Sequence, residues 1–150
     1  MAAATRVLCL SGPNLQLLGS REPEVYGTAT LGEIHARLEA RGRELGAAVD
    51  ARQTNHEGTL VDWIGKARAS GFAGVLLNPG AYTHTSIAIH DAVKAVALPC
   101  VEVHLSNPDA REAFRRRSFI ARACVGRVAG FGADSYVLAL EGLLRVLSRA

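Results

Sequence analysis

Residues 7–27 read VLCLSGPNLQLLGSREPEVYG and join a short apolar run to an unusually long connection. The apolar run at residues 7–10 is typical of a buried β-strand. The prolines and glycines that follow it do not continue a strand. A strand-to-helix connection usually takes about 2–6 residues, and a longer one in a compact domain usually carries function. We therefore expect the polar residues of this connection, above all Arg21 and Tyr26, to serve a site.

The same alternation of an apolar run and a helical pattern recurs along the rest of the chain. Further strand-like runs lie at residues 48–52, 74–77, 100–105 and 125–129, and helical periodicity is found at residues 31–45, 59–69, 86–96, 110–116 and 134–147. Thr30 and Glu33 form a capping-box pattern, and Gly71 is placed to end the second helix. This alternation predicts a flavodoxin-like α/β fold, with a doubly wound five-stranded parallel sheet in a three-layer sandwich. We expect residues 1–150 to form one domain.

The composition indicates an ordinary globular protein, with 49% hydrophobic and 21% charged residues. No apolar run approaches the roughly 18–20 residues of a membrane span, and no signal-peptide pattern is visible, so we expect a cytoplasmic protein that binds no membrane. Cys9, Cys100 and Cys124 fall in apolar runs and are expected to be buried, unpaired thiols. The net charge of +3 suits either a nucleic acid or a small anionic ligand.

Polar residues of unusual type gather where three of the expected strands end. In doubly wound sheets, ligands bind beyond the carboxyl ends of the strands. Asn14, Arg21 and Tyr26 follow the first strand, Asn78 and His84 follow the third, and His104, Ser106, Arg111 and Arg115 follow the fourth. We therefore expect these residues to form one site.

Two common kinds of site fit this pattern poorly. A phosphate-binding loop needs consecutive backbone N–H groups and glycines, whereas residues 11–14 contain a single glycine and Pro13 has no N–H. His84 and His90 are six residues apart, which does not suit a helical metal-ligand pair, and the Glu102–His104 pair lacks a third ligand at a fixed spacing. The residues therefore favour neither a phosphate-binding loop nor a metal site.

Glu102 and His104 are expected on the same side of the fourth strand, because side chains alternate with a period of two. A carboxylate beside an imidazole fixes its tautomer and favours its protonated form, as a general acid requires. The alternative is a buried structural pair, in which the two side chains only satisfy each other's hydrogen-bonding groups. The position of His104 at the carboxyl end of a strand favours the general acid.

Arginines supply the other expected chemistry. Arg111 and Arg115 are spaced i, i+4 on a predicted short helix, where their guanidiniums suit a carboxylate or another oxygen-rich ligand, although a solvated basic face is an alternative. An ordinary tyrosine is almost fully protonated at neutral pH, but a fixed cation nearby favours the phenolate. Arg21 would in this way make Tyr26 a base that removes a proton next to a carbonyl group.

Together these motifs resemble the type II 3-dehydroquinate dehydratase family. The matching segments are LSGPNLQLLGSREPEVYG at residues 10–27, TNHEG at 54–58, NPGAYTHTS at 78–86 and EVHLSN at 102–107. The resemblance covers essentially the whole chain. It implies a flavodoxin-like fold, a homododecamer built as a tetramer of trimers, and dehydration of 3-dehydroquinate to 3-dehydroshikimate in the shikimate pathway, with no cofactor and no Schiff-base lysine.

The resemblance also implies a role for each candidate site residue. Tyr26 would be the base and Arg21 its activator; His104 would be the acid, positioned by Glu102; and Asn14 would support the site that stabilises the enolate. The substrate would be held by Asn78, His84, Leu105, Ser106 and Arg115, while Asp91 would reach into the site of a neighbouring subunit. The chain departs from the family pattern at Ser11 and Gln16, where asparagine is usual, and at Ser135, where glycine is common.

Two other classes of function remain open at this point. A flavodoxin-like module that binds a nucleotide or flavin without catalysis fits the fold, but the missing phosphate loop counts against it. A nucleic-acid binder could use the arginines of residues 111–117, but only 5% of the chain is aromatic and no aromatic residues interleave them as base-stacking requires. We therefore expect the partners to be a small-molecule substrate and further copies of the chain, and not a nucleic acid.

Overall fold

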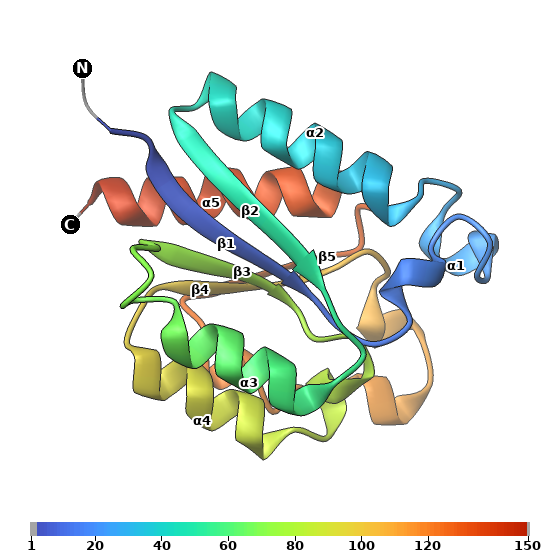
Figure 1. Cartoon of the computed structure of the whole chain (residues 1–150). Coiled ribbons are helices and arrows are strands. Elements are labelled where there is room, and N and C mark those ends of the chain that lie inside the picture. The colour runs from blue at the N-terminus through green and yellow to red at the C-terminus, as the bar shows by residue number, and fades with distance from the viewer. Residues whose placement is uncertain (1–2, 150) are drawn as a thin grey trace.

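The computed structural model describes residues 3–149 and contains a five-stranded parallel sheet (Figure 1). The strands are β1 (Thr5–Ser11), β2 (Ala47–Gln53), β3 (Gly74–Asn78), β4 (Cys100–His104) and β5 (Gly126–Ala129). Their order across the sheet is β2-β1-β3-β4-β5, and every neighbouring pair is parallel. The connections place helices on both faces of the sheet, which confirms the predicted flavodoxin-like, doubly wound α/β fold.

Two layers of helices enclose the sheet (Figure 1). Helices α2 (Leu31–Glu44) and α5 (Asp134–Ser148) cover one face, and α3 (Glu57–Lys66) and α4 (Ile87–Val96) cover the other. The single turn α1 (Pro23–Tyr26) lies within the long connection from β1 to α2. As predicted, Thr30 caps the start of α2, and its hydroxyl accepts a hydrogen bond from the Glu33 N–H at 3.2 Å. None of the helices within residues 3–149 has both the length and the apolar character that crossing a bilayer requires.

The predicted helix over residues 110–116 is wrong, because this segment forms two short 3₁₀ turns instead. The turns are η3 (Pro108–Ala110) and η4 (Ala113–Arg115), separated by Arg111 in an extended conformation with φ −116° and ψ −159°. None of residues 110–116 is buried. A short helix without a buried apolar face gains too little from packing to form, so the i, i+4 spacing of the arginines does not reflect a helix here.

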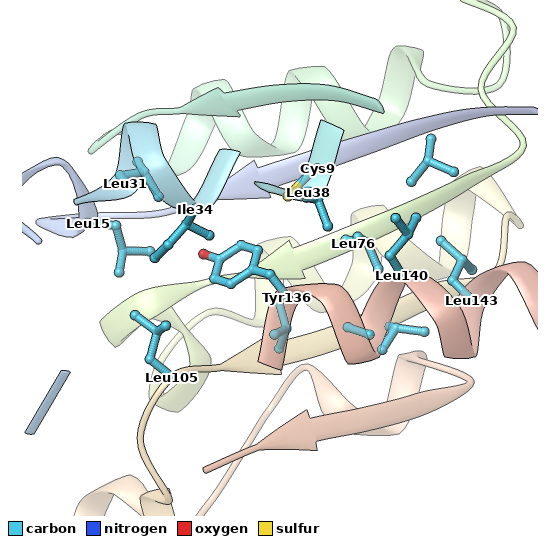
Figure 2. Packing of buried hydrophobic residues seen from close by; sticks show 14 of the residues in the cluster. Cys9, Leu15, Leu31, Ile34, Leu38, Leu76, Leu105, Tyr136, Leu140 and Leu143 are labelled. Carbon is cyan, nitrogen blue, oxygen red and sulfur yellow. The ribbon is translucent and has the colours of Figure 1, made fainter. Parts of the chain in front are cut away.

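The core lies in two parts, because successive side chains of each strand face opposite helical layers. Leu8, Leu10 and Leu77 pack toward α3 and α4, whereas alternate strand residues pack toward α2 and α5. Figure 2 shows the second part, in which the ring of Tyr136 lies among aliphatic side chains including Ile34. Cys9 and Cys100 are buried free thiols, as predicted, whereas Cys124 is unpaired but only partly buried. Burial raises the pKa of the Cys9 thiol to about 12.

The long connection begins at Gly12, which lies tightly against the end of β3. Its N–H donates to the Asn78 carbonyl oxygen at 2.8 Å. A Cβ atom at this position would lie 2.6 Å from the carbonyl oxygen of Pro79, closer than side chains approach a backbone. Glycine therefore allows the connection to leave β1 directly beside β3. This hydrogen bond also occupies an N–H that a phosphate cradle would need.

We predict that Gly12→Ala lowers the free energy of unfolding by about 1–3 kcal/mol, because the added methyl group overpacks a backbone contact. Urea denaturation monitored by circular dichroism measures this change. Gly142→Ala is the matched control, since a Cβ atom at this exposed position of α5 would meet nothing within 4 Å beyond the nearby backbone of its own helix, and it should stabilise the chain by about 0.5–1 kcal/mol. Equal stability of Gly12→Ala and the wild type would show that the contact is not tight.

Candidate active site

The carboxyl ends of β1, β3 and β4 border a cavity of about 260 Å³. It is lined by Pro13, Asn14, Leu15, Arg21, Tyr26, Asn78, Gly80, Ala81, His84, His104, Leu105, Ser106, Pro108, Arg111 and Arg115. Of the residues predicted for the site, only Glu102 and Asp91 are missing from this lining. Glu102 lies directly behind His104, to which it is bonded, and Asp91 is exposed on α4. The structure thus brings together the segments that follow three separate strands.

The connection between β1 and α2 is anchored near its start and turns sharply before it reaches the cavity. Asn14 has a left-handed backbone with φ +68°, and its N–H donates to the Asn55 side chain at 3.0 Å. Leu15 and Leu18 are buried in the core below. Gln16, one of the departures from the family pattern, accepts a hydrogen bond from the Gln53 side-chain amide at 3.0 Å. These contacts fix the first half of the connection, and α1 then brings Tyr26 to the cavity.

Two guanidinium groups lie against the ring of Tyr26. The Cζ atom of Arg21 is 4.6 Å from the ring centroid, and the Cζ atom of Arg111 is 5.1 Å from it. Arg21 was predicted as the partner of Tyr26, whereas Arg111 was predicted only as a ligand for anions. Both distances are within the range of cation–π contacts. The sequence contains no local signal for the Arg111 contact, because it joins segments that are distant along the chain.

Glu112 lies between Arg111 and Arg115 and forms an ion pair with each of them. Its Oε1 atom lies 3.1 Å from Nε of Arg115 and 3.7 Å from Nε of Arg111. Arg111 also donates to the Ser106 hydroxyl at 3.3 Å. The side chain of Arg111 is 16% exposed and that of Arg115 is 19% exposed, so both lie in the wall of the cavity and do not form a freely solvated basic surface. Their guanidiniums are placed to meet an anionic ligand.

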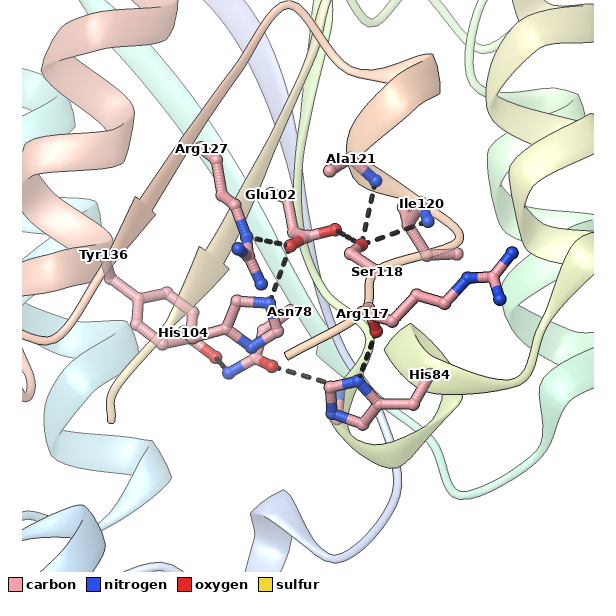
Figure 3. Close-up of polar contacts among 11 residues, drawn as sticks. Asn78, His84, Glu102, His104, Arg117, Ser118, Ile120, Ala121, Arg127 and Tyr136 are labelled. Carbon is pink, nitrogen blue, oxygen red and sulfur yellow. Dashed lines mark hydrogen bonds and ion pairs between the residues drawn. The ribbon is translucent and has the colours of Figure 1, made fainter. Parts of the chain in front are cut away.

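The predicted Glu102–His104 pair is present, and it belongs to a larger polar network (Figure 3). His104 Nε2 lies 2.9 Å from Glu102 Oε2, and the Ser118 hydroxyl donates to Oε1 at 2.6 Å. Arg127 donates from Nε to Oε2. Burial by itself would raise the pKa of Glu102, but the hydrogen bonds from His104 and Ser118 and the charge of Arg127 hold it below its usual value.

The ionised Glu102 determines which nitrogen of His104 is available for chemistry. A carboxylate can only accept hydrogen bonds, so Nε2 of His104 must be the donor. Nδ1 is then the nitrogen that can give or take a proton. Because His104 lines the cavity, this proton can be exchanged with a bound ligand.

His84 is held in the opposite role, as an acceptor. Its Nδ1 lies 2.8 Å from the carbonyl oxygen of Arg117, which can only accept, so Nδ1 carries the proton and donates. Burial lowers the pKa of His84 and outweighs the effect of this hydrogen bond. The neutral ring therefore leaves Nε2 as an acceptor, which suits a hydroxyl group of a ligand.

Asn78 is oriented by residues that the sequence pattern did not identify. Its Nδ2 donates to the Tyr136 hydroxyl at 3.0 Å, and its Oδ1 accepts from the Gly80 N–H at 3.1 Å. The Tyr136 hydroxyl also bonds the Ser11 hydroxyl at 2.8 Å, and burial raises the pKa of Tyr136, which keeps it neutral. The only signal in the sequence is a polar ring within the apolar stripe of α5. Ser11, a departure from the family pattern, is thus part of a buried hydrogen-bonded chain.

A family model described as Dehydroquinase class II matches residues 5–144. The chain belongs to this family. Membership makes it an enzyme, a hydro-lyase. The 3-dehydroquinate dehydratase of Thermus thermophilus is 57% identical over 141 residues, which are 94% of this chain and 95% of that protein. The 3-dehydroquinate dehydratase of Rhizobium johnstonii is 54% identical over 140 residues, which are 93% of this chain and 96% of that protein.

Solved structures of class II dehydroquinases have the same fold. The type II dehydroquinase of Butyrivibrio crossotus superposes with a TM-score of 0.92 at 37% identity and covers 94% of this chain and 98% of its own. The type II dehydroquinase of Propionibacterium acnes gives a TM-score of 0.89 at 41% identity, with 99% of both chains covered. The agreement in fold extends over the whole region that contains the cavity.

The side chains available around the cavity restrict the kinds of chemistry that this class II dehydroquinase fold can place there. Lys66 and Lys94, the two lysines of the sequence, are exposed on α3 and α4 and do not line the cavity, so neither is placed to form a Schiff base with a ligand there. Within residues 3–149, no three histidine, cysteine, aspartate or glutamate side chains gather as ligands for a metal ion. The groups that do line the cavity suit proton transfer and the binding of an anionic, hydroxylated ligand.

We predict that Glu102→Gln flattens the loss of stability at acid pH. The pKa of Glu102 is lower in the folded chain than in the unfolded chain, so its carboxylate stabilises the fold above about pH 4.3, the ordinary value for glutamate. This contribution is lost as the pH falls through the folded value. Urea denaturation between pH 6 and 3 should therefore show a shallower decline in unfolding free energy for the variant than for the wild type.

Asp62→Asn is the matched control for this measurement. Asp62 is an exposed carboxyl on α3, and among the described residues it makes no ion pair. Its replacement should leave the dependence of stability on pH near that of the wild type. An unchanged acid decline in Glu102→Gln would contradict the assignment of Glu102 as a stabilising carboxylate.

Proposed function

We propose that this chain is a 3-dehydroquinate dehydratase that removes water from 3-dehydroquinate through an enolate. The observation that carries the proposal is the arrangement within one cavity of Tyr26, flanked by two guanidiniums, and His104, bonded to the ionised Glu102. An elimination next to a carbonyl group needs a base, an acid for the leaving hydroxyl and a group that steadies the oxyanion. The names of the relatives and the solved structures support the same reaction.

Tyr26 is the base in this mechanism. Its phenolate, favoured by Arg21 and Arg111, removes the proton from the carbon next to the ketone, and the electron pair of the broken C–H bond moves to the carbonyl oxygen. Asn14 lines the same cavity and belongs to the part of the site that steadies the resulting enolate oxygen. The electron pair remains in the enolate until the carbon–oxygen bond of the leaving hydroxyl breaks.

His104 is the acid that completes the elimination. The enolate carbonyl re-forms, a carbon–carbon double bond forms next to it, and the carbon–oxygen bond of the leaving hydroxyl breaks. His104 gives its Nδ1 proton to that hydroxyl, which departs as water. Glu102 holds the imidazole by Nε2, so the proton that moves is the one on the ring atom left for the cavity. A return of the Tyr26 proton to His104 restores both groups for another turnover.

The remaining residues of the lining suit a polyhydroxylated carboxylate. Arg115 provides a guanidinium for the carboxylate, and His84 provides an acceptor for a hydroxyl. Asn78, Leu105 and Ser106 complete the substrate contacts that we propose. Asp91 is exposed on α4 and outside the cavity of its own chain, which agrees with a role in the site of a neighbouring subunit of a homododecamer. We place the reaction in the shikimate pathway and the enzyme, one domain over residues 1–150, in the cytoplasm.

We predict that the wild-type chain incubated with 3-dehydroquinate produces the ultraviolet absorbance of a conjugated enone. Tyr26→Phe should lower kcat by at least about 100-fold, because the base is lost while the ring and its packing remain. Tyr82→Phe is the matched control, since it loses a hydroxyl that bonds Asn55 at 2.8 Å outside the cavity, and it should keep nearly full activity. Activity of Tyr26→Phe at the wild-type rate would exclude Tyr26 as the base.

We predict that Arg21→Ala lowers kcat by about 10²–10³-fold with little change in stability, because its side chain acts on Tyr26 from the exposed connection. Arg43→Ala removes an exposed arginine of α2 that does not line the cavity, and it should leave kcat unchanged. The enone assay gives the rates, and thermal unfolding checks the fold. A full rate for Arg21→Ala would show that Arg21 does not activate the base.

A further inference from the structure

Arg127 lies beside the proposed acid but does not line the cavity. It is on β5, the edge strand, where its register partner on β4 is Glu102. Its Nε donates to Glu102 Oε2, the same oxygen that accepts the hydrogen bond from His104 Nε2 (Figure 3). The carboxylate is fully buried, whereas the arginine side chain is 27% exposed. One oxygen of Glu102 is therefore shared between a cation and the imidazole.

This ion pair does not have the geometry that gives an arginine–carboxylate pair its greatest strength. A fork-to-fork pair uses two parallel N–H···O bonds, one to each carboxylate oxygen. Here Oε1 is taken by Ser118, and Nη2 of Arg127 is buried with no hydrogen-bond partner among the described residues. The pair is thus directed at the oxygen that contacts His104. This geometry points to an effect on the imidazole in addition to any effect on stability.

The charge balance around His104 shows what that effect is. From β4, Glu102 attracts the protonated imidazole, and from β5, Arg127 offsets part of that attraction through the shared oxygen. Other elements also bring charged or titratable groups near the His104 ring. His84 on η2 (Gly80–His84) is one of them, with Arg115 of η4 beside it. The others are in the lining of the shared cavity, namely Arg21, Tyr26 and Arg111. Within residues 3–149, none of these other cations bonds Glu102. Arg127 is therefore the cation that acts on the carboxylate itself.

We propose that Arg127 is a positioning residue that tunes His104 as an acid by sharing the carboxylate of Glu102. With Arg127 present, the imidazolium is held less strongly and gives its proton more readily to the leaving hydroxyl. Without Arg127, the full charge of Glu102 acts on His104, which keeps its proton to higher pH and is a weaker acid. This role rests on the proposed dehydratase reaction.

The pH dependence of kcat tests this role in Arg127→Gln, which removes the charge and retains an amide donor. The alkaline limb of the profile should move to higher pH by about one unit. This shift corresponds to an increase of about tenfold in the affinity of His104 for its proton. At pH 7 kcat should fall by about three- to tenfold, as expected for a weaker acid, with KM within about twofold of the wild type. Arg127→Met, a second neutral variant that keeps the aliphatic stem, should give the same displacement if the glutamine variant folds poorly.

Two further variants separate charge at this position from other causes. Arg127→Lys keeps a cation beside Glu102 and should keep the wild-type profile. Arg122→Gln removes the same net charge from an exposed position in η5 (Ala121–Ala123) and should also leave the profile unchanged. A displacement of equal size in Arg127→Lys or in Arg122→Gln would overturn the proposal, and so would an unchanged profile in both neutral Arg127 variants.

A readout that does not depend on turnover distinguishes this proposal from the proposed function. The ¹³Cε1–H resonance of His104, assigned by its loss in His104→Gln, reports the protonation of the ring directly. Its titration midpoint should rise by about one pH unit in Arg127→Gln and remain unchanged in Arg122→Gln. An equal midpoint in Arg127→Gln and the wild type overturns the role of Arg127. A wild-type chain that forms no enone while the midpoint still shifts overturns the dehydratase reaction but not the electrostatic coupling.

Discussion

The negative charge of Glu102 is the constraint on which much of the site depends. A carboxylate without exposed surface loses its hydration and is tolerated only when polar groups replace the lost water. The replacements come from three parts of the chain, namely His104 on β4, Arg127 on β5 and Ser118 in the segment between these strands. Ser118 in turn accepts from the backbone N–H groups of residues 120 and 121. One buried charge thereby fixes two strands, the loop that joins them and the orientation of the imidazole.

A second buried polar chain holds the other side of the cavity. The Tyr136 hydroxyl links Ser11 at the end of β1 to Asn78 at the end of β3. Gly12 adds a backbone hydrogen bond between the same strand ends. Because Ser11, Tyr136 and Asn78 are each hydrogen-bonded within this network, loss of one hydroxyl would leave the others unsatisfied. The cavity is therefore bordered by two networks, one based on a charge and one on neutral groups, and each reaches the cavity through one lining residue, His104 or Asn78.

The features that could be predicted from the sequence are those with a local cause. The strands and the long helices follow from hydrophobic periodicity, and the Glu102–His104 contact follows from the two-residue period of a single strand. The contacts of Arg127 and Tyr136 could not be predicted, because they depend on which strand lies beside β4 and on how α5 packs. The expected helix over residues 110–116 failed for a related reason. Its spacing was helical, but the fold provides no apolar surface to bury it.

The same reasoning limits what could be predicted about Tyr26. Its nearness to Arg21 along the chain made that pair an expected one, and the short α1 turn places them together. Arg111 approaches the ring from a segment that follows β4, 85 residues further along the chain than Tyr26. A contact of this kind depends on the shared carboxyl edge of the sheet. The edge could be predicted from the strand order of the fold class, but the individual pairs across it could not.

The anchoring of the β1–α2 connection has a mechanical consequence. Its first half is fixed to the core by buried Leu15 and Leu18 and to β3 by the Gly12 hydrogen bond. The part that carries Arg21 and Tyr26 lies between Gly19 and Gly27, whose φ angles are +97° and +83°. Glycine crosses between backbone conformations at low cost. A residue with a side chain at either position would therefore strain the backbone that places Arg21 and Tyr26 at the cavity, even though neither glycine touches a ligand.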